Sequence, residues 1–227
     1  MPASPVLLFD IDGTLLQSHG VGRRSVTAAL ADLVGDTFDF SDVTFSGKTD
    51  PQIFREVLEA AGRHGLAVEG ATPEAFLSLY AREMEARLPS ATVEALPGAV
   101  ALVRRLAGDG AEIGLLTGNI EAIAYDKVAR IDLGRELFPF GAFGSDHADR
   151  DALPAIGARR ASDHLGRTIE TSELVIIGDT PRDIACAHAS GAFAVAVATG
   201  RYSADELADA DLVLDTLEAF SLDTLRA

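Results

Sequence analysis

The sequence predicts an α/β fold in which a doubly wound parallel sheet is joined by a helical domain inserted near the N-terminus. Short continuous apolar runs alternate with longer segments whose apolar residues recur at helical spacing. Alternation of this kind is typical of strand–helix–strand units around a parallel sheet. Residues 17–96 depart from it, because they show helical patterns and no convincing buried strand.

The expected strands are four short runs rich in Val, Ile and Leu, each ending at a polar residue or a glycine. They lie at residues 6–9, 113–116, 174–177 and 194–197. Because these runs are continuously apolar, they indicate strands buried on both faces, as in a parallel sheet. Weaker runs at residues 138–143 and 212–214 are candidates for two further strands.

Segments of helical length separate the later runs. They span residues 98–108, 120–133, 151–165 and 181–190. Their apolar residues recur at the spacing of a helix face. Pro181 suits the first position of a helix, where the missing N–H would have no partner in any case.

Residues 17–96 are expected to form an all-helical domain inserted into the α/β core. Three long helical patterns fill them, at residues 21–33, 51–61 and 73–88, and Leu96-Pro97-Gly98 marks the return to the core. The predicted core therefore consists of residues 1–16 and 97–227.

The composition of the 227-residue chain restricts its partners. The net charge is −16 and no cluster of Lys and Arg is present, which argues against nucleic acid or an anionic membrane as a partner. The longest apolar runs are about half as long as a membrane span. The single cysteine, Cys186, cannot form an intramolecular disulfide and is expected in the packed core. We expect a cytoplasmic protein, either a monomer or a homodimer.

Acidic residues follow two of the predicted strands. Asp10 and Asp12 follow the first, and Asp179 follows the run at residues 174–177. Alternation along a strand turns Asp10 and Asp12 the same way, and ligands of open α/β sheets bind outside the carboxyl ends of the strands. If the two strands are neighbours, the three carboxylates form an oxygen-only site that suits Mg²⁺. Turn or helix-cap roles for Asp12 and Asp179 are the structural alternative.

Three motifs resemble signatures of the haloacid dehalogenase superfamily. They are DIDGT at residues 10–14, LLTGN at residues 115–119 and IIGDTPRD at residues 176–183. The resemblance spans the whole chain, because the helical insert falls where this superfamily places its first-type cap. It is strongest to the phosphoglycolate phosphatase and β-phosphoglucomutase-like branch. It implies a Rossmann-like core and a helical cap that encloses the substrate.

The resemblance implies a role for each acidic residue. Asp10 would attack phosphorus and form an aspartyl-phosphate, without needing a base, because a carboxylate is ionised at neutral pH. Asp12 would protonate the leaving group and then deprotonate water, and an acid at this position favours phosphoryl transfer over dehalogenation. Mg²⁺ would be held by Asp10, the main-chain carbonyl of Asp12 and Asp179.

The second motif implies a phosphate site. The Thr117 hydroxyl and the amides of Gly118 and Asn119 would bind phosphoryl oxygens, as amides at a helix N-terminus bind anions. The alternative is a plain strand-to-helix turn.

The third motif of the superfamily departs from its usual form in this chain. It normally carries a lysine ahead of the fourth motif, whereas no lysine follows Lys127 here. Arg150 is the best substitute, since it is a permanent cation able to hold the phosphoryl group beside Asp10. Arg159 and Arg160 are the other candidates for this role, and a surface role for Arg150 is the alternative.

Three further residues are candidates. Asp183, four residues after Asp179, would orient a metal-bound water or Arg150, or would simply be a favourable acid in the first turn of a helix. Lys48 lies in the glycine-containing loop FSGKTD of the expected cap, where it would face the substrate or else be solvated. His19 follows the first motif, although a lone histidine in a loop more often has no catalytic role.

These residues predict a Mg²⁺-dependent phosphatase that hydrolyses a small phosphorylated metabolite, similar to phosphoglycolate or a sugar phosphate, through an aspartyl-phosphate. One alternative is a phosphomutase that uses the same aspartyl-phosphate and excludes water when its cap closes. The other is a non-catalytic, phosphate-binding regulatory protein, which the missing lysine leaves open. The fold alone does not decide among them, because this architecture hosts many chemistries.

Overall fold

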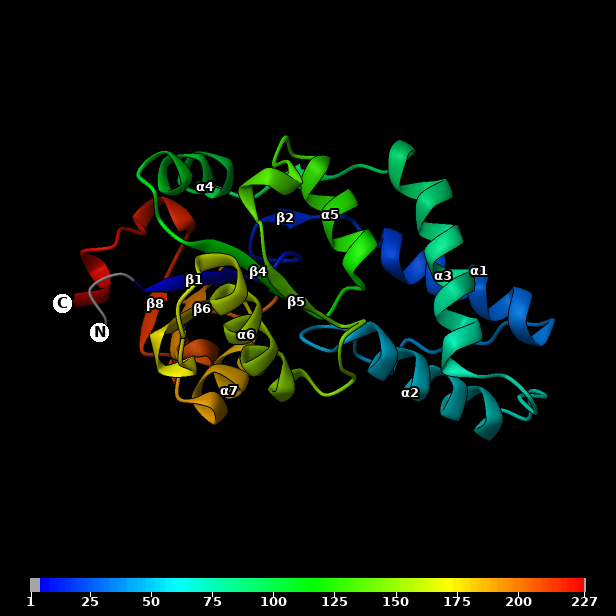
Figure 1. The fold of residues 1–227 in the computed structure, drawn as a ribbon. Coiled ribbons are helices and arrows are strands. Elements are labelled where there is room, and N and C mark those ends of the chain that lie inside the picture. Colours follow the sequence, from blue (N-terminus) through cyan, green and yellow to red (C-terminus); the bar gives the residue numbers. More distant parts are fainter. Residues whose placement is uncertain (1–4, 227) are drawn as a thin grey trace.

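The structure, a computed structural model that describes residues 5–226, has the predicted α/β class. Six strands pair in parallel in one sheet, in the spatial order β5-β4-β1-β6-β7-β8 (Figure 1). They are β1 (Val6–Phe9), β4 (Ile113–Thr117), β5 (Gly141–Phe143), β6 (Leu174–Gly178), β7 (Phe193–Val197) and β8 (Leu212–Leu214). Each of the six apolar runs corresponds to one strand, so the predicted parallel sheet is confirmed.

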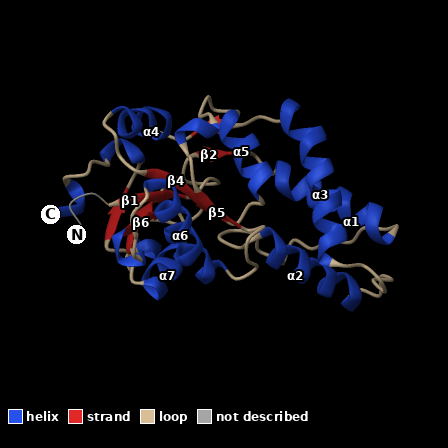
Figure 2. Cartoon of the chain, in the orientation of Figure 1, coloured by secondary structure: helices blue, strands red, loops and turns tan. Residues whose placement is uncertain are grey.

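Four helices cover the two faces of the sheet. Alternate residues of each strand point to opposite faces, so strands that are apolar throughout need cover on both sides. The helices are α4 (Ala99–Gly108), α5 (Glu121–Ala129), α6 (Leu153–Leu165) and α7 (Pro181–Ser190). Leu7 and Phe9 of β1 share an apolar cluster with residues of α4 and α5. Val6 and Leu8 share another with residues of α6 and α7. The doubly wound arrangement is therefore confirmed, and Figure 2 shows the strands enclosed between these helices.

Two expected elements are shorter in the structure. The helix expected over residues 120–133 covers only Glu121–Ala129, and the left-handed backbone of Asp132 (φ 59°) excludes a helix that continues to residue 133. The strand expected over residues 138–143 covers only its last three residues. The N–H of Phe138 donates instead to the carbonyl of Arg135 at 3.0 Å, which closes a short turn ahead of the strand.

Three helices of the insert pack around a third apolar cluster, away from the sheet, which Ile123 of α5 also joins (Figure 1). They are α1 (Val21–Val34), α2 (Asp50–Arg63) and α3 (Pro73–Arg87). The ring centroid of Phe54, on α2, lies 4.7 Å from that of Phe76 and 5.0 Å from that of Tyr80. Both partner rings belong to α3, so these contacts join the second and third helices of the insert.

A small antiparallel pair of strands marks the base of the insert. It consists of β2 (Leu16–Gln17) and β3 (Glu94–Ala95), where the chain leaves the core and returns to it. The sequence predicted no strand at either place, since two residues are too few to show a pattern. The domain boundaries at residues 16/17 and 96/97, which fall at this pair, stay a prediction.

The start of α2 rests directly on the turn that follows β4. The N–H of Asp50 donates to the carbonyl of Gly118 at 2.7 Å, and the Asp50 carboxylate accepts from the N–H of Ile120 at 2.9 Å. Position 118 needs a glycine, because a Cβ there would lie 2.1 Å from the carbonyl oxygen of Lys48. The insert is thus held against the carboxyl end of the sheet.

Two smaller observations concern the helices. Cys186, on α7, is fully buried as expected, and burial raises the pKa of its thiol to about 12. Across residues 5–226, no helix has the length and apolar character that crossing a membrane requires.

Candidate active site

A cavity of about 340 Å³ lies between the helical insert and the carboxyl ends of β1, β4 and β6. Nine of the candidate site residues line it: Asp10, Asp12, His19, Lys48, Thr117, Gly118, Asn119, Arg150 and Asp179. Because β1 pairs with β6, Asp10 and Asp179 follow neighbouring strands into the same cavity. Asp183 does not line the cavity but forms an ion pair with Arg150.

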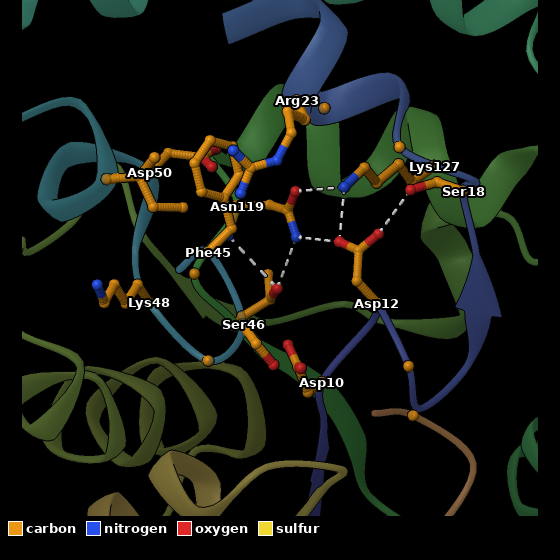
Figure 3. A pocket seen from close by; sticks show the side chains of 18 of the residues that line it. Asp10, Asp12, Ser18, Arg23, Phe45, Ser46, Lys48, Asp50, Asn119 and Lys127 are labelled. Atoms are coloured by element: carbon orange, nitrogen blue, oxygen red, sulfur yellow. Dashed lines mark hydrogen bonds and ion pairs between the residues drawn. The ribbon is translucent and has the colours of Figure 1, made fainter. Parts of the chain in front are cut away.

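Asp10 follows β1 and is buried. Its N–H donates to the carbonyl of Ile177 at 2.8 Å, which continues the pairing of β1 with β6 and fixes the direction of the side chain. Its Oδ1 lies 3.4 Å from Nη2 of Arg150. Burial raises the pKa of Asp10 to about 6, with Arg150 opposing the rise and Asp183 adding to it. Figure 3 shows this carboxylate at one end of the cavity.

Asp12 has a separate set of partners (Figure 3). Its Oδ2 accepts from Nζ of Lys127 at 2.6 Å and from Nδ2 of Asn119 at 2.9 Å, and its Oδ1 accepts from the hydroxyl of Ser18 at 3.0 Å. Burial alone would raise the pKa of Asp12, but the Lys127 ammonium and these hydrogen bonds lower it below its usual value. The Asp12 side chain is therefore held in its ionised form.

Lys127 was not among the residues expected in the site. It lies on α5, is buried, and donates to Oδ1 of Asn119 at 2.7 Å as well as to Asp12. It follows Asn119 by eight residues, about two helical turns, so the two can meet on one side of the helix. That spacing after the TGN motif, in a chain with only two lysines, was the available sequence signal.

Three buried carboxylates form a cluster beside Asp12. Asp10, Asp179 and Asp183 each offer an oxygen, and these oxygens lie within 4.8 Å of one another. Burial raises the pKa of Asp179 to about 9, and the charges of Asp183 and Asp10 add to the rise. Crowded carboxylates without nitrogen or sulfur ligands are the donor set that a hard divalent cation prefers. The residues present therefore fit Mg²⁺.

Glycines pack tightly around the Asp179 carboxylate. A Cβ at Gly13 would lie 2.3 Å from one of its oxygens, and a Cβ at Gly200 would lie 1.7 Å from the same atom. Both distances are far shorter than any real contact between a Cβ and an oxygen. The DIDGT turn and the loop after β7 therefore approach Asp179 only because they carry glycine here.

Arg150 is the arginine that the fold brings to Asp10. It lies in a 3₁₀ turn (Arg150–Ala152) ahead of α6, is buried, and pairs with Asp183 as well as with Asp10. Burial alone would lower its pKa, but the carboxylates of Asp183 and Asp10 raise it instead. Its Nε–H has no acceptor among the described residues. Arg159 is exposed, and Arg160 is bound to Asp146 at 2.6 Å.

Asp183 combines the two roles considered for it. Its Oδ2 accepts from the N–H of Thr180 at 3.0 Å, which completes a capping box at the start of α7. Its Oδ1 accepts from Arg150. One carboxylate thus starts a helix and holds the arginine that reaches Asp10.

The turn after β4 is built from the second motif. Thr117 is fully buried, and its Oγ1 accepts from Nδ2 of Asn119 at 2.9 Å. Gly144, after β5, packs on the same turn, because a Cβ there would lie 2.0 Å from the carbonyl oxygen of Gly118. Two neighbouring strands and the insert therefore fix this turn.

Two candidates from the insert and its base are paired with acids. Nζ of Lys48 lies 2.5 Å from Oε2 of Glu56, so its charge is balanced although it lines the cavity. Nε2 of His19 lies 3.2 Å from Oε2 of Glu94, near the solvent. Both side chains therefore have partners within the chain itself.

Comparison with known proteins identifies the family. A family model described as haloacid dehalogenase-like hydrolase matches residues 5–191. The chain belongs to this family. The predicted membership is thereby confirmed, and the motifs that carried the resemblance are the ones that meet in the cavity.

Two kinds of relative agree with this placement. Phosphoglycolate phosphatase of Cereibacter sphaeroides (strain ATCC 17029) is 29% identical over 189 residues, which cover 82% of each chain. CbbY of Rhodobacter sphaeroides, solved in complex with phosphate, has a TM-score of 0.72 at 20% identity and covers 99% of this chain and 100% of its own. β-Phosphoglucomutase of Clostridium difficile has a TM-score of 0.71 at 18% identity, covering 98% and 96%. The solved structures show the same fold, and the prediction of a phosphatase-type enzyme in this branch is confirmed.

Proposed function

We propose that the chain is a Mg²⁺-dependent phosphatase that hydrolyses a small phosphorylated metabolite of the phosphoglycolate kind through an aspartyl-phosphate on Asp10. The position of Asp10 carries this proposal, because it lies buried between the cation Arg150 and the carboxylate cluster. Curated relatives bear the name phosphoglycolate phosphatase. A cavity of about 340 Å³ is near the lower limit for ligand sites and suits a small ester.

The reaction proposed for Asp10 has two steps. One carboxylate oxygen attacks phosphorus, the phosphorus–oxygen bond of the ester breaks, and the leaving alkoxide takes a proton from Asp12. Water then attacks the aspartyl-phosphate and gives a proton to Asp12, and the bond between phosphorus and Asp10 breaks. Phosphate leaves, and both carboxyl groups return to their starting forms.

The cations and amides of the site act on the phosphoryl group. Nη2 of Arg150 faces Asp10 at 3.4 Å, and Nε–H of the same guanidinium has no acceptor among the described residues. A guanidinium placed here suits a phosphoryl oxygen. Asp10, Asp179 and the main-chain carbonyl of Asp12 would hold Mg²⁺. When bound, the metal offsets the repulsion between phosphate and carboxylates and stabilises charge on the phosphoryl oxygens. The Gly118 and Asn119 amides would hold the remaining oxygens.

Asp12 is arranged for the second step in particular. Lys127 and Asn119 hold its carboxylate ionised, which is the form that accepts a proton from water. For the first step Asp12 must take up a proton from solvent as the ester binds, against these contacts, and it returns that proton to solvent after phosphate leaves. We propose that Lys127 acts here as a positioning residue, since it touches Asp12 and not the phosphate.

The test is a hydrolysis screen. Phosphoglycolate, sugar phosphates, nucleotides and pyrophosphate are offered with Mg²⁺ and with a chelator, and phosphate release is measured. Asp10→Asn should leave less than about one thousandth of the wild-type rate, because the nucleophile is lost. Asp32→Asn is a matched control, since Asp32 is partly exposed and pairs with Arg82 on the outer helices. Undiminished turnover by Asp10→Asn, or equal turnover in chelator, would contradict the proposal.

The same screen separates the two alternatives from the phosphatase. A sugar phosphate that yields an isomer without free phosphate would indicate the phosphomutase. Metal binding without turnover of any ester would indicate the non-catalytic regulatory protein. A cytoplasmic location, the lack of nucleic-acid or membrane partners, and the choice between monomer and homodimer stay predictions.

A further inference from the structure

An arginine of the insert enters the cavity from the side opposite Asp10. Arg23 lies in the first turn of α1, and Figure 3 shows its side chain descending into the cavity. The guanidinium carbon lies 4.1 Å from the ring centroid of Phe45. Nη2 donates to the carbonyl of Val43 at 2.8 Å and Nη1 to that of Phe40 at 3.2 Å. These contacts hold the guanidinium in one place.

Arg23 forms no ion pair with a carboxylate among the described residues, although the charge of the exposed Asp39 acts on it. Within residues 5–226, no Asp or Glu oxygen lies within ion-pair distance of it. The buried cations that share the cavity are paired: Lys48 with Glu56, Lys127 with Asp12, and Arg150 with Asp183. Arg201 also lines the cavity but is exposed to solvent. Among the described residues, Arg23 is therefore the partly buried cation of this cavity that forms no ion pair with an acid.

The free donors of Arg23 suit an anion. A guanidinium carries five N–H donors, and the two carbonyls take two of them, which leaves three. The planar fork of arginine matches the two oxygens of a carboxylate or a phosphate. The ring of Phe45 covers one face of the guanidinium, so an anion would bind at its edge, inside the cavity.

We propose that Arg23 binds a second anionic group of the substrate, and that the preferred substrate is a small phosphomonoester that also bears a carboxylate or a second phosphate. The proposal rests on the phosphatase activity proposed above and adds its specificity. Arg23 acts on the substrate's far end and takes no part in the chemistry at phosphorus. Lys48, expected from the sequence to face the substrate, is less suited because Glu56 already holds its ammonium.

The experiment compares three esters of similar length that differ in their second group. They are phosphoglycolate with a carboxylate, 2-hydroxyethyl phosphate with a neutral hydroxyl, and ethylene glycol bisphosphate with a second phosphate. Arg23→Met should lower kcat/KM for the preferred anionic ester by roughly 10- to 150-fold, and change it for the neutral ester by less than about twofold. Most of the loss should appear in KM. Arg23→Lys should restore part of the preference, because it keeps the charge but not the fork.

Arg24→Met is the matched control. Arg24 is the next residue of α1, is exposed, and donates to the carbonyl of His19 without lining the cavity. It should hydrolyse all three esters at wild-type rates. The wild type's choice between phosphoglycolate and the bisphosphate identifies the second group.

Three results would overturn the inference, and they are distinguishable. Equal losses on charged and neutral esters in Arg23→Met would mean that Arg23 only holds the loop that carries Phe40 and Phe45. Wild-type protein that hydrolyses the neutral ester as well as both anionic ones would leave the phosphatase proposal standing and remove this one. No hydrolysis of any ester would remove both.

Discussion

Replacing Lys127 by methionine should destabilise the fold by about 2–3 kcal/mol near pH 8 and by less near pH 5. The substitution keeps an unbranched side chain of similar length in α5 but removes the ammonium. That ammonium donates to Oδ2 of Asp12 at 2.6 Å and to Oδ1 of Asn119 at 2.7 Å. Without it, a carboxylate and an amide oxygen lose their donor.

The magnitude follows from the burial of each partner. Removing one member of a fully buried ion pair costs about 3–5 kcal/mol, because the other charge is left uncompensated. The Lys127 side chain is 4% exposed, but that of Asp12 is 36% exposed. Water in the cavity can therefore solvate part of the Asp12 charge. The expected loss is at or below the lower end of that range.

The pH dependence has a definite sign. The pKa of Asp12 is lower in the folded chain than in the unfolded chain. The stabilisation that ionised Asp12 contributes is therefore fully present above the pKa of the unfolded chain, and it is lost as the pH falls through the pKa of the folded chain. In the variant the ammonium no longer lowers this pKa. Asp12 can then take up a proton at mildly acidic pH, which relieves the unpaired charge. The difference between wild type and variant should thus narrow from pH 8 toward pH 5.

Urea unfolding followed by circular dichroism measures both quantities. Arg82→Met is the control, since it removes a cation whose side chain is 58% exposed and whose partner Asp32 is 48% exposed. A pair this near the surface should contribute about 1 kcal/mol or less. Equal, small losses in the two variants near pH 8 would refute the assignment of Lys127 as a buried partner of Asp12.

Two further predictions test how the insert meets the core. Burial raises the pKa of Asp50 to about 7, against the opposing charge of Lys127, so between about pH 4 and 7 the folded chain holds a proton that the unfolded chain releases. The free energy of unfolding of the wild type should fall as the pH rises through this window, and that of Asp50→Asn should fall less. Identical slopes of the free energy of unfolding against pH in the two proteins would contradict this. Gly118→Ala places a Cβ 2.1 Å from the Lys48 carbonyl oxygen and should cost about 1–3 kcal/mol in thermal unfolding. Gly108→Ala, in open space on α4, should cost nothing, and an equal loss in both would argue against the clash.

The sheet and the acidic end of the site follow from rules that act on short stretches of sequence. Runs such as residues 174–177 are apolar throughout, because both faces of their strands are covered. Asp10 and Asp179 come directly after two such runs, so the pairing of β1 with β6 was enough to bring them together. Neither step required knowledge of distant side chains.

The rest of the site depends on packing that no local pattern reports. A lysine on a helix, such as Lys127, looks the same in sequence whether it faces solvent or a buried carboxylate. Only the way α5 packs against the DIDGT turn turns it toward Asp12. The pairing of Lys48 with Glu56 was equally hidden, because the two residues lie eight positions apart across the start of α2. Arg23 escaped attention for the same reason.

The glycines around the reactive carboxylates divide the cavity into two parts with different freedom to change. At Gly13 and Gly200 a Cβ would meet the Asp179 carboxylate, and at Gly118 it would meet the Lys48 carbonyl of the insert. The opposite wall is made of ordinary side chains, such as Val26 and Ile53. Natural drift, or a library of variants screened for new substrates, can therefore alter which ester enters while the phosphate end stays the same. Catalysis and substrate choice can evolve at different rates within one small cavity.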